Sequence, residues 1–294
     1  MKSVAGQNSV SGHLKSASLS TDINASFFIG IIYTGDNSRL QDTLRSALRP
    51  GKVGLSISVF VFHPKQTVPQ IDVASNITLV AFEGTEDLFK KFVTTIDKSN
   101  ASYCTVTTDG AEFFEATFGS VHDIFATYGE INWVTGIQTF KAPGGFNISL
   151  GSTALRRWSH KIYERNLYKN SGRQIPAAST FWRKSVWPLV IRDVHFVSKQ
   201  GFLEDLWVAF FKTQQLYTCK IYFSGSDDLG QATTRNFKQP NHVTLIESSF
   251  LDKIKEFLFV NNVPYLRVLY RRESEFSPIV RFDHNTQSYF LSEY

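Results

Sequence analysis

Short apolar runs alternate with amphipathic stretches through the first half of this chain. Runs at 27–32, 53–62, 77–82 and 103–108 have the length of buried strands, whereas 40–48 and 87–96 repeat apolar residues at helical spacing. Helical spacing returns at 113–125, and a further strand is expected at 131–136. The alternation predicts an α/β fold: a mostly parallel, doubly wound sheet flanked by helices, with ligands at the carboxyl ends of its strands.

The helical stretch at 202–212 is apolar on nearly every side. Val208 and Ala209 occupy the side that a surface helix normally leaves polar. We therefore expect a buried helix that carries Glu204 and Asp205 inward in its first turn, where free amides and the helix dipole stabilise a carboxylate. Such a carboxylate facing a cavity is a candidate general base, and the alternative is a pair of first-turn acids facing solvent.

The rest of the pattern divides the chain. A strand at 217–223 and a turn at 224–228 follow the apolar helix, and 140–173 is predicted to be a loop with one helix at 154–168. A helix at 248–260 and an alternating segment at 265–270 predict a small C-terminal α+β appendage. Residues 1–25 are rich in Ser, Asn and Gly and lack an apolar core. We expect a flexible leader (1–25), a main domain (26–235) and an appendage (236–294).

Charge and cysteine content narrow the classes of protein. The net charge of +5 is mild, and no long basic block predicts a nucleic-acid partner. The densest basic residues are Arg156, Arg157, Arg267, Arg271 and Arg272. They are either part of the solvated surface or a site that attracts anionic lipid headgroups or a sugar diphosphate. Cys104 and Cys219 lie in apolar segments, as thiols of a reducing compartment do. No apolar run reaches the length of a membrane span, so a cytoplasmic protein is expected.

Polar residues follow two of the predicted strands. Thr34 and Asp36 come after the first strand, which is followed by neither a G-x-G-x-x-G motif nor a P-loop. Thr107 and Thr108 end the strand at 103–108, and Asp109 comes directly after them. Asp109 with the glycine that follows is typical of a tight turn.

A resemblance connects these candidates. Residues 179–183, Ser-Thr-Phe-Trp-Arg, with the apolar run 186–189, resemble the "stF(F/W)R…lw" signature of bacterial family 2 glycosyltransferases. Residues 204–207, Glu-Asp-Leu-Trp, resemble the acidic helix that follows that signature, and 131–136 is similar to the family's "wvtG" strand. The resemblance extends weakly from about residue 27 to about residue 231.

The resemblance implies a GT-A-like fold and assigns roles to residues. Asp205 matches the acid that deprotonates the acceptor hydroxyl, with Glu204 assisting, and Asp109 matches the ligand of a divalent cation, Mg²⁺ or Mn²⁺, on the donor diphosphate. Phe181 and Trp182 would form a wall for a sugar ring and Arg183 would lie near an anion, unless the three begin a helix packed in the core. The implied donor- and acceptor-binding residues are Thr34, Asp36, Thr107, Thr108, Gly136, Phe181, Trp182 and Arg183.

The chain also departs from the family pattern. One acid, Asp109, stands where the family carries an acidic pair, and His63 stands near the end of the second strand where the family carries an acid that reads the base or ribose. The implied function is inverting transfer of a sugar from a nucleotide-diphosphate donor to a glycan or lipid-linked acceptor, in surface polysaccharide synthesis at the inner face of the membrane. The alternative is a catalytically degenerate member of the same fold that binds carbohydrate or assists assembly.

Overall fold

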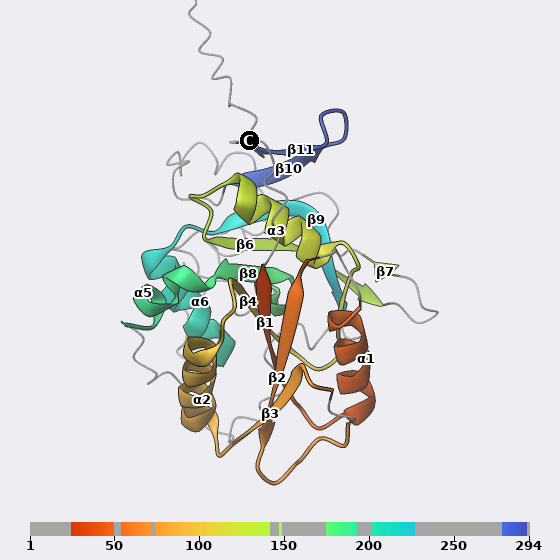
Figure 1. Ribbon diagram of the computed structural model, residues 1–294, viewed down its shortest axis with the longest axis vertical. Coiled ribbons are helices and arrows are strands. Elements are labelled where there is room, and N and C mark those ends of the chain that lie inside the picture. Colours follow the sequence, from red (N-terminus) through yellow and green to blue (C-terminus); the bar gives the residue numbers. More distant parts are fainter. Residues whose placement is uncertain are drawn as a thin grey trace, which may run out of the picture.

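The computed structural model describes residues 25–49, 54–71, 74–141, 147–148, 175–192, 202–226 and 278–292. Within them, an eleven-stranded sheet has the order β11-β10-β9-β6-β8-β4-β1-β2-β3, with β5 paired to β9 and β7 to β6. Helices lie on both faces of this sheet (Figure 1). The predicted α/β class is therefore confirmed.

The strands and helices have the following bounds. The strands are β1 Ser26–Ile32, β2 Ser56–Pro64, β3 Ile77–Phe82, β4 Tyr103–Thr108, β5 Ala111–Phe113, β6 Trp133–Lys141, β7 Asn147–Ile148, β8 Thr180–Arg183, β9 Tyr217–Ser226, β10 Ile279–Asp283 and β11 Ser288–Ser292. The helices are α1 Asn37–Ala47, α2 Thr85–Lys98, α3 Thr117–Thr127, α5 Trp187–Arg192 and α6 Phe202–Thr213, with 3-10 turns η1 Ala177–Ser179 and η2 Lys184–Val186.

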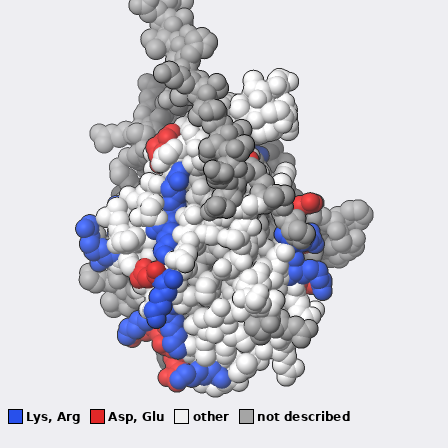
Figure 2. Space-filling view, in the orientation of Figure 1, with Lys and Arg blue, Asp and Glu red and all other residues white. Residues whose placement is uncertain are grey.

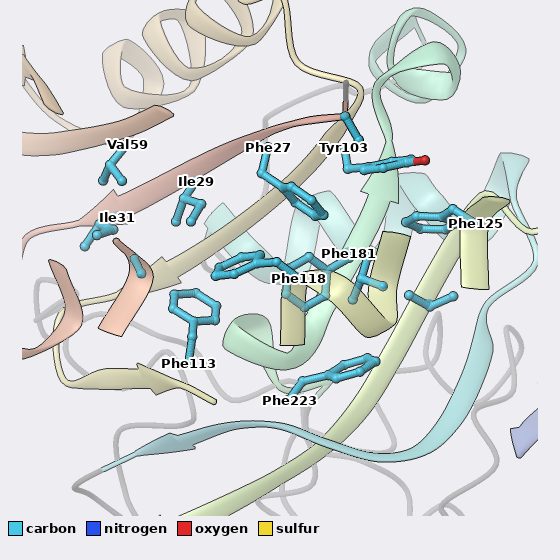
Figure 3. Close-up of a cluster of buried hydrophobic side chains, with 14 of the residues drawn as sticks. Phe27, Ile29, Ile31, Val59, Tyr103, Phe113, Phe118, Phe125, Phe181 and Phe223 are labelled. Carbon is cyan, nitrogen blue, oxygen red and sulfur yellow. The ribbon is translucent and has the colours of Figure 1, made fainter. Parts of the chain in front are cut away.

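Alternate residues of the central strands enter two separate apolar clusters, one on each face. On β1, Phe27, Ile29 and Ile31 face α1 and α3, whereas Phe28 and Ile32 face α2 and α6. The first cluster is rich in phenylalanine rings that meet edge to face, as Figure 3 shows. Burial on both faces is what parallel strands require, because helices cover both sides of a parallel sheet.

The cluster on the second face is built on tryptophan. Trp133, Trp182, Trp187 and Trp207 are buried, and the rings of Trp182 and Trp207 meet nearly at right angles, 6.1 Å apart. The helix α6 supplies Trp207 to this cluster and is buried along most of its length, as its sequence predicts.

Most predicted elements match the structure, and three differ. Helix α3 begins at Thr117 and not at 113, because Gly110 turns the chain at φ +86° and residues 111–113 form strand β5, which pairs with β9. The same pairing extends β9 to Ser226, where a turn was expected. Residues 180–183 form strand β8, paired with β4 and β6, so the alternative in which they begin a helix is wrong. The predicted helices at 154–168 and 248–260 and the segment at 265–270 lie outside the described residues.

The described end of the chain joins the main sheet. Strand β10 pairs in parallel with β9 and in antiparallel with β11, and the Tyr128 hydroxyl donates to the Tyr289 carbonyl at 2.6 Å. The hairpin of β10 and β11 thus extends the sheet at one edge (Figure 1). The predicted boundary between 235 and 236 lies outside the described residues and stays a prediction. Within the part of the chain that the structure describes, no helix combines the length and apolarity needed to cross a membrane.

Candidate functional site

The order of the strands reverses between β1 and β4, and we call the sheet edge at the carboxyl ends of these two strands the crevice. From β1 the sheet continues through β2 to β3 on one side and through β4 on the other, and all of these pairs are parallel. Ile32 and Thr108 are register partners, so β1 and β4 end side by side. In open α/β sheets, ligands bind outside the strand ends where the strand order reverses. This edge of the sheet is therefore the candidate site.

Thr34 and Asp109 close the crevice floor with two hydrogen bonds. The Thr34 amide donates to Oδ2 of Asp109 at 2.9 Å, and the Thr34 hydroxyl donates to Oδ1 at 2.7 Å. Asp109 is buried, whereas Thr34 is exposed. The two strand ends, far apart in sequence, are thus joined by the residues that the sequence singled out.

The first turn of α1 lies against the same point. Asp36 caps the helix, its Oδ1 accepting from the Arg39 amide at 3.1 Å. The Thr43 hydroxyl accepts from the Gly110 amide at 2.9 Å, and an Arg39 terminal nitrogen lies 3.5 Å from the Asp109 carbonyl. Helix α1 therefore holds the Asp109–Gly110 turn from one side.

The carboxyl of Asp109 is in an environment that opposes its charge. Burial raises its pKa above the ordinary 3.8, while the hydrogen bonds from Thr34 and the charge of Arg39 act in the opposite direction. Beside it, Thr107 is buried with its hydroxyl bonded to the Thr108 carbonyl, and Thr108 is partly exposed at the strand end. Thr108 and Thr34 are thus the more accessible members of this group.

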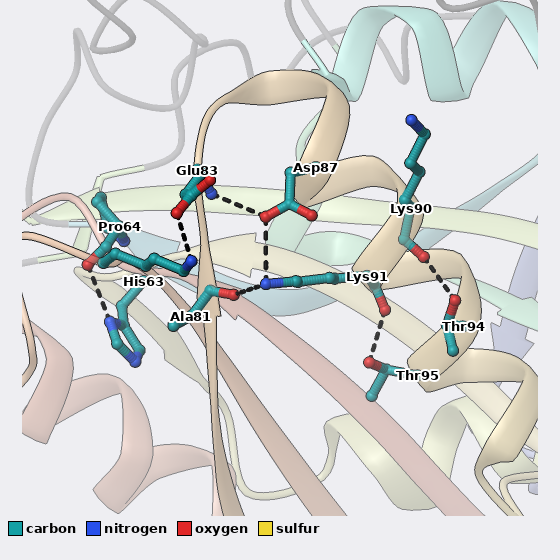
Figure 4. A network of polar contacts seen from close by, with 10 residues as sticks. His63, Pro64, Ala81, Glu83, Asp87, Lys90, Lys91, Thr94 and Thr95 are labelled. Atoms are coloured by element: carbon teal, nitrogen blue, oxygen red, sulfur yellow. Dashed lines mark hydrogen bonds and ion pairs between the residues drawn. The ribbon is translucent and has the colours of Figure 1, made fainter.

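The end of β2 carries a buried imidazole instead of an acid. His63 is buried, and its Nδ1 lies 3.0 Å from the Pro64 carbonyl, which accepts only, so Nδ1 carries the proton. Next to it, Lys65 pairs with Glu83, and Lys91 contacts Asp87 and the Ala81 carbonyl (Figure 4). Both lysines thus already have partners at the strand ends.

The two candidate acids of α6 lie on the other face of the sheet. Asp205 is half-buried in the first turns of the helix, and the side chain of Glu204 lies outside the described part of the chain. Helix α6 packs on the face that carries α2, whereas Asp109 is bonded from the side of α1. Asp205 and Asp109 thus belong to opposite faces of the sheet.

The aromatic part of the signature is core structure. Phe181 and Trp182 have no exposed surface and pack into the first and second clusters respectively. Both side chains therefore pack in the core, and neither presents a face to a sugar ring.

Arg183 is likewise occupied. Its guanidinium donates to the carbonyls of Phe125, Tyr128 and Ile131 and lies over the Phe125 ring at 5.0 Å. It therefore holds the C-terminal end of α3, and its described hydrogen bonds go to carbonyl groups.

Gly136 has a packing role at a bulge between β6 and β9. A Cβ atom there would lie 2.7 Å from Cγ of Phe223, which has no exposed surface. Only glycine leaves room for this ring. The structure gives Gly136 no contact with the crevice residues described above.

The protein groups at the crevice do not by themselves form a divalent-ion site. Asp109 offers the one carboxylate at the floor, and each of its oxygens already accepts from Thr34. Among the described residues, no group of three or more His, Cys, Asp or Glu is placed to hold a metal ion. We therefore assign no chemical step to a metal.

The surface shows no large basic patch on the side seen in Figure 2. Lys and Arg side chains lie among Asp and Glu over the region of α2, and α2 itself carries the pairs Lys90–Glu86 and Lys91–Asp87. The basic residues singled out from the sequence, Arg156, Arg157, Arg267, Arg271 and Arg272, lie outside the described residues.

Sequence reasoning missed Arg39 and Thr43. Both lie on α1, where an arginine and a threonine look like ordinary helix residues. The available signal was Asp36, a helix-capping type directly after a strand, which places the next turn of helix at the strand end.

Comparisons with known proteins give structural similarity alone. No protein-family model matches the chain, and no curated protein matches it significantly. Among solved structures the chain is similar to S. aureus TarS, with 8% identity over 69% of this chain, 37% of that chain and a TM-score of 0.45. It is also similar to TarS 1–349 (TM-score 0.43, 60% of that chain) and to TarS 1–349 in complex with UDP-GlcNAc (TM-score 0.44, 58% of that chain), again with 8% identity over 69% of this chain. The chain thus spans between about a third and three fifths of those proteins.

Proposed function

We propose that this chain is a GT-A-like glycosyltransferase that moves a sugar from a nucleotide-diphosphate donor to a glycan or lipid-linked acceptor hydroxyl, with inversion. The observation that carries the proposal is the junction of Thr34 and Asp109 at the ends of β1 and β4, where an α/β sheet binds nucleotides. The signature at 179–183 and the acidic helix at 204–207 support the reaction class. The proposed setting is the cytoplasm, at the inner face of the membrane, in surface polysaccharide synthesis.

The donor and the acceptor are proposed to meet at the carboxyl edge of the sheet. There the exposed Thr34 and Asp36 and the partly exposed Thr108 receive the donor. Asp205, on the helix that packs on the other face, accepts the proton of the acceptor hydroxyl at this edge as the hydroxyl oxygen attacks the anomeric carbon. The bond from that carbon to the diphosphate oxygen breaks, and the diphosphate leaves with the electron pair. Attack opposite to the leaving group gives inversion.

Glu204 is proposed to steady the helix start or the acceptor. The divalent cation remains a prediction from the sequence, with Asp109 as its protein ligand.

The second candidate is a degenerate member of the fold that binds carbohydrate without transferring it. Its support is the buried His63 at the end of β2, where its ring is bonded to the Pro64 carbonyl, together with the single engaged carboxylate at the crevice. In that case donor binding is weakened or lost while the fold is kept.

Turnover of nucleotide sugars separates the two candidates. The full chain is incubated with a panel of UDP-, GDP-, TDP- and CMP-sugars with Mg²⁺, Mn²⁺ or EDTA, and release of the nucleotide is measured with and without glycan acceptors. The transferase predicts one preferred diphosphate donor, with release abolished in Asp205→Asn. A folded chain that binds glycans yet turns over no donor would select the second candidate. A folded chain that neither binds glycans nor turns over a donor would remove both candidates.

A further inference from the structure

Arg39 is the basic side chain that reaches the crevice floor. Side chains near the start of a helix point back toward its N-terminus, and the Arg39 guanidinium accordingly lies at the Asp109–Gly110 turn. A Cβ atom at position 110 would lie 2.5 Å from Nε and 2.7 Å from Cζ of Arg39. The guanidinium therefore rests on the glycine backbone, in a position that any other residue at 110 would disturb.

The donors of this guanidinium are largely unused. Of its five N–H groups, one has an acceptor among the described residues, the Asp109 carbonyl at the long distance of 3.5 Å. The Nε atom is buried and has no acceptor in the same set. Two other described arginines are engaged: Arg183 donates to three carbonyls, and Arg45 pairs with Asp42 at 2.8 Å. An unpaired buried donor is costly, so Arg39 is held at the crevice without a matching internal partner.

The carboxylate oxygens of Asp109 do not bond to this guanidinium. Both oxygens of Asp109 accept from Thr34, whereas Arg39 approaches the backbone oxygen of the same residue. A planar guanidinium with free N–H groups matches phosphate oxygens in geometry and in charge. The place is also the edge at which an α/β sheet receives phosphorylated ligands.

We propose that Arg39 binds the diphosphate of the donor and supplies positive charge to it at this crevice. The assignment rests on the proposed function for the identity of the ligand, and on the unused guanidinium for its place. Arg39 then stabilises the diphosphate both in the bound donor and as it leaves.

The test measures binding of inorganic diphosphate, UDP and GDP, with UMP and GMP alongside, by calorimetry in EDTA and again with Mn²⁺. The variants are Arg39→Gln and Arg39→Lys, with Arg45→Gln as the matched control on the same helix. We expect Arg39→Gln to weaken diphosphate binding in EDTA by about 10- to 100-fold, the range for one charged hydrogen-bonding partner. Arg39→Lys should recover part of the affinity, because it keeps the charge and loses the planar fork. Arg45→Gln should match the wild type, and all variants should melt near it.

Each other outcome is decisive. Equal diphosphate affinity in wild type and a folded Arg39→Gln overturns the assignment and leaves the glycosyltransferase proposal standing. Binding of inorganic diphosphate that depends on Arg39, without binding of any nucleotide, keeps the anion site and removes the proposed donor. A third result also overturns the assignment: the wild-type chain binds no diphosphate in EDTA, and in Mn²⁺ the wild type and Arg39→Gln bind diphosphate with equal affinity.

Discussion

Asp109 joins the ends of two strands through its side chain, so its replacement tests structure before it tests chemistry. In Asp109→Ala the amide and hydroxyl of Thr34 both lose a charged acceptor in a partly buried place, and the free energy of unfolding should fall by about 1–3 kcal/mol. In Asp109→Asn the amide oxygen accepts from the same N–H, and the Thr34 hydroxyl can rotate to accept from the new NH₂ group. Urea unfolding of both variants measures the difference.

Asp36 provides the control for that comparison. Asn caps helices as well as Asp does, so Asp36→Asn should unfold at nearly the wild-type urea concentration. Equal stability of Asp109→Ala and the wild type would mean that the Thr34 bonds do not hold the strand ends together.

The raised pKa of Asp109 makes stability depend on pH in a defined direction. Between the ordinary value of 3.8 and the raised folded value, the folded chain binds a proton that the unfolded chain has released. The contribution of this carboxyl to stability is therefore fully present below 3.8 and is lost as pH rises through the folded pKa. As pH rises from below 3.8 through the raised folded pKa, wild type should lose more unfolding free energy than Asp109→Asn does. Parallel curves for the two proteins would contradict the burial argument.

Asp205 is the residue on which the proposed chemistry depends most. Asp205→Asn keeps the volume and removes the proton acceptor, so turnover should fall by about 100-fold or more while donor affinity changes little. Glu204→Gln should cost less, since Glu204 lies about 100° away around the helix. Steady-state kinetics with a competent acceptor decide the matter, and a greater loss at Glu204 would mean that the other acid is the base.

Among the elements, α3 depends on a side chain from a distant strand. Arg183 of β8 donates to the carbonyl of Phe125 in the last turn of α3 and to the carbonyls of Tyr128 and Ile131 beyond it, where a helix leaves carbonyls without partners inside the helix. Arg183→Met keeps much of the apolar stem and removes those donors. The free energy of unfolding should fall by about 2–3 kcal/mol.

Arg45→Met is the corresponding surface change, because Arg45 and Asp42 form an exposed pair on α1. Its effect should stay below about 1 kcal/mol. If chemical denaturation gave the two methionine variants the same midpoint, Arg183 would have no special role at the end of α3.

Elements with strong local patterns were predictable, and those made by distant pairing were not. The runs at 77–82 and 103–108 coincide with β3 and β4, because short runs of apolar, aromatic and β-branched residues favour strands locally. The three-residue strand β5 exists through its partner β9, more than a hundred residues later, and nothing local marks it. The same holds for β8, in which Phe181 and Trp182 face opposite clusters as a strand requires.

The candidate site divides in the same way. Thr34 and Asp109 were identified because the ends of parallel strands meet at one edge, which follows from the fold class alone. The packing roles of Arg183 and Gly136 depend on which ring or carbonyl lies opposite each residue. The sequence does not contain that arrangement in any short-range form.

At the scale of the whole molecule, the C-terminal hairpin covers an edge of the sheet. Deleting residues 278–294 would uncover β9 and remove the buried Ile279 and Val280, each contributing about 1.5–3 kcal/mol of burial. The truncated chain should melt several degrees lower and aggregate through the exposed strand edge. Melting curves and light scattering measure both effects.

Phe290→Ser serves as its control, because this side chain on β11 is 43% exposed. It should melt close to the full-length wild type. A truncated chain that stays monomeric and melts with the wild type would show that the hairpin is dispensable.

The insertion of β8 between β4 and β6 has a consequence for the chain as it is synthesised. Strand β4 emerges early and pairs with β1 on one side, but its other edge pairs with Thr180–Arg183, which emerges much later. Until then β4 and β6 each present an open edge, and Cys104 of β4 and Trp133 of β6 lack their register partner Trp182. A nascent chain stalled before residue 180 is therefore the form most in need of a chaperone.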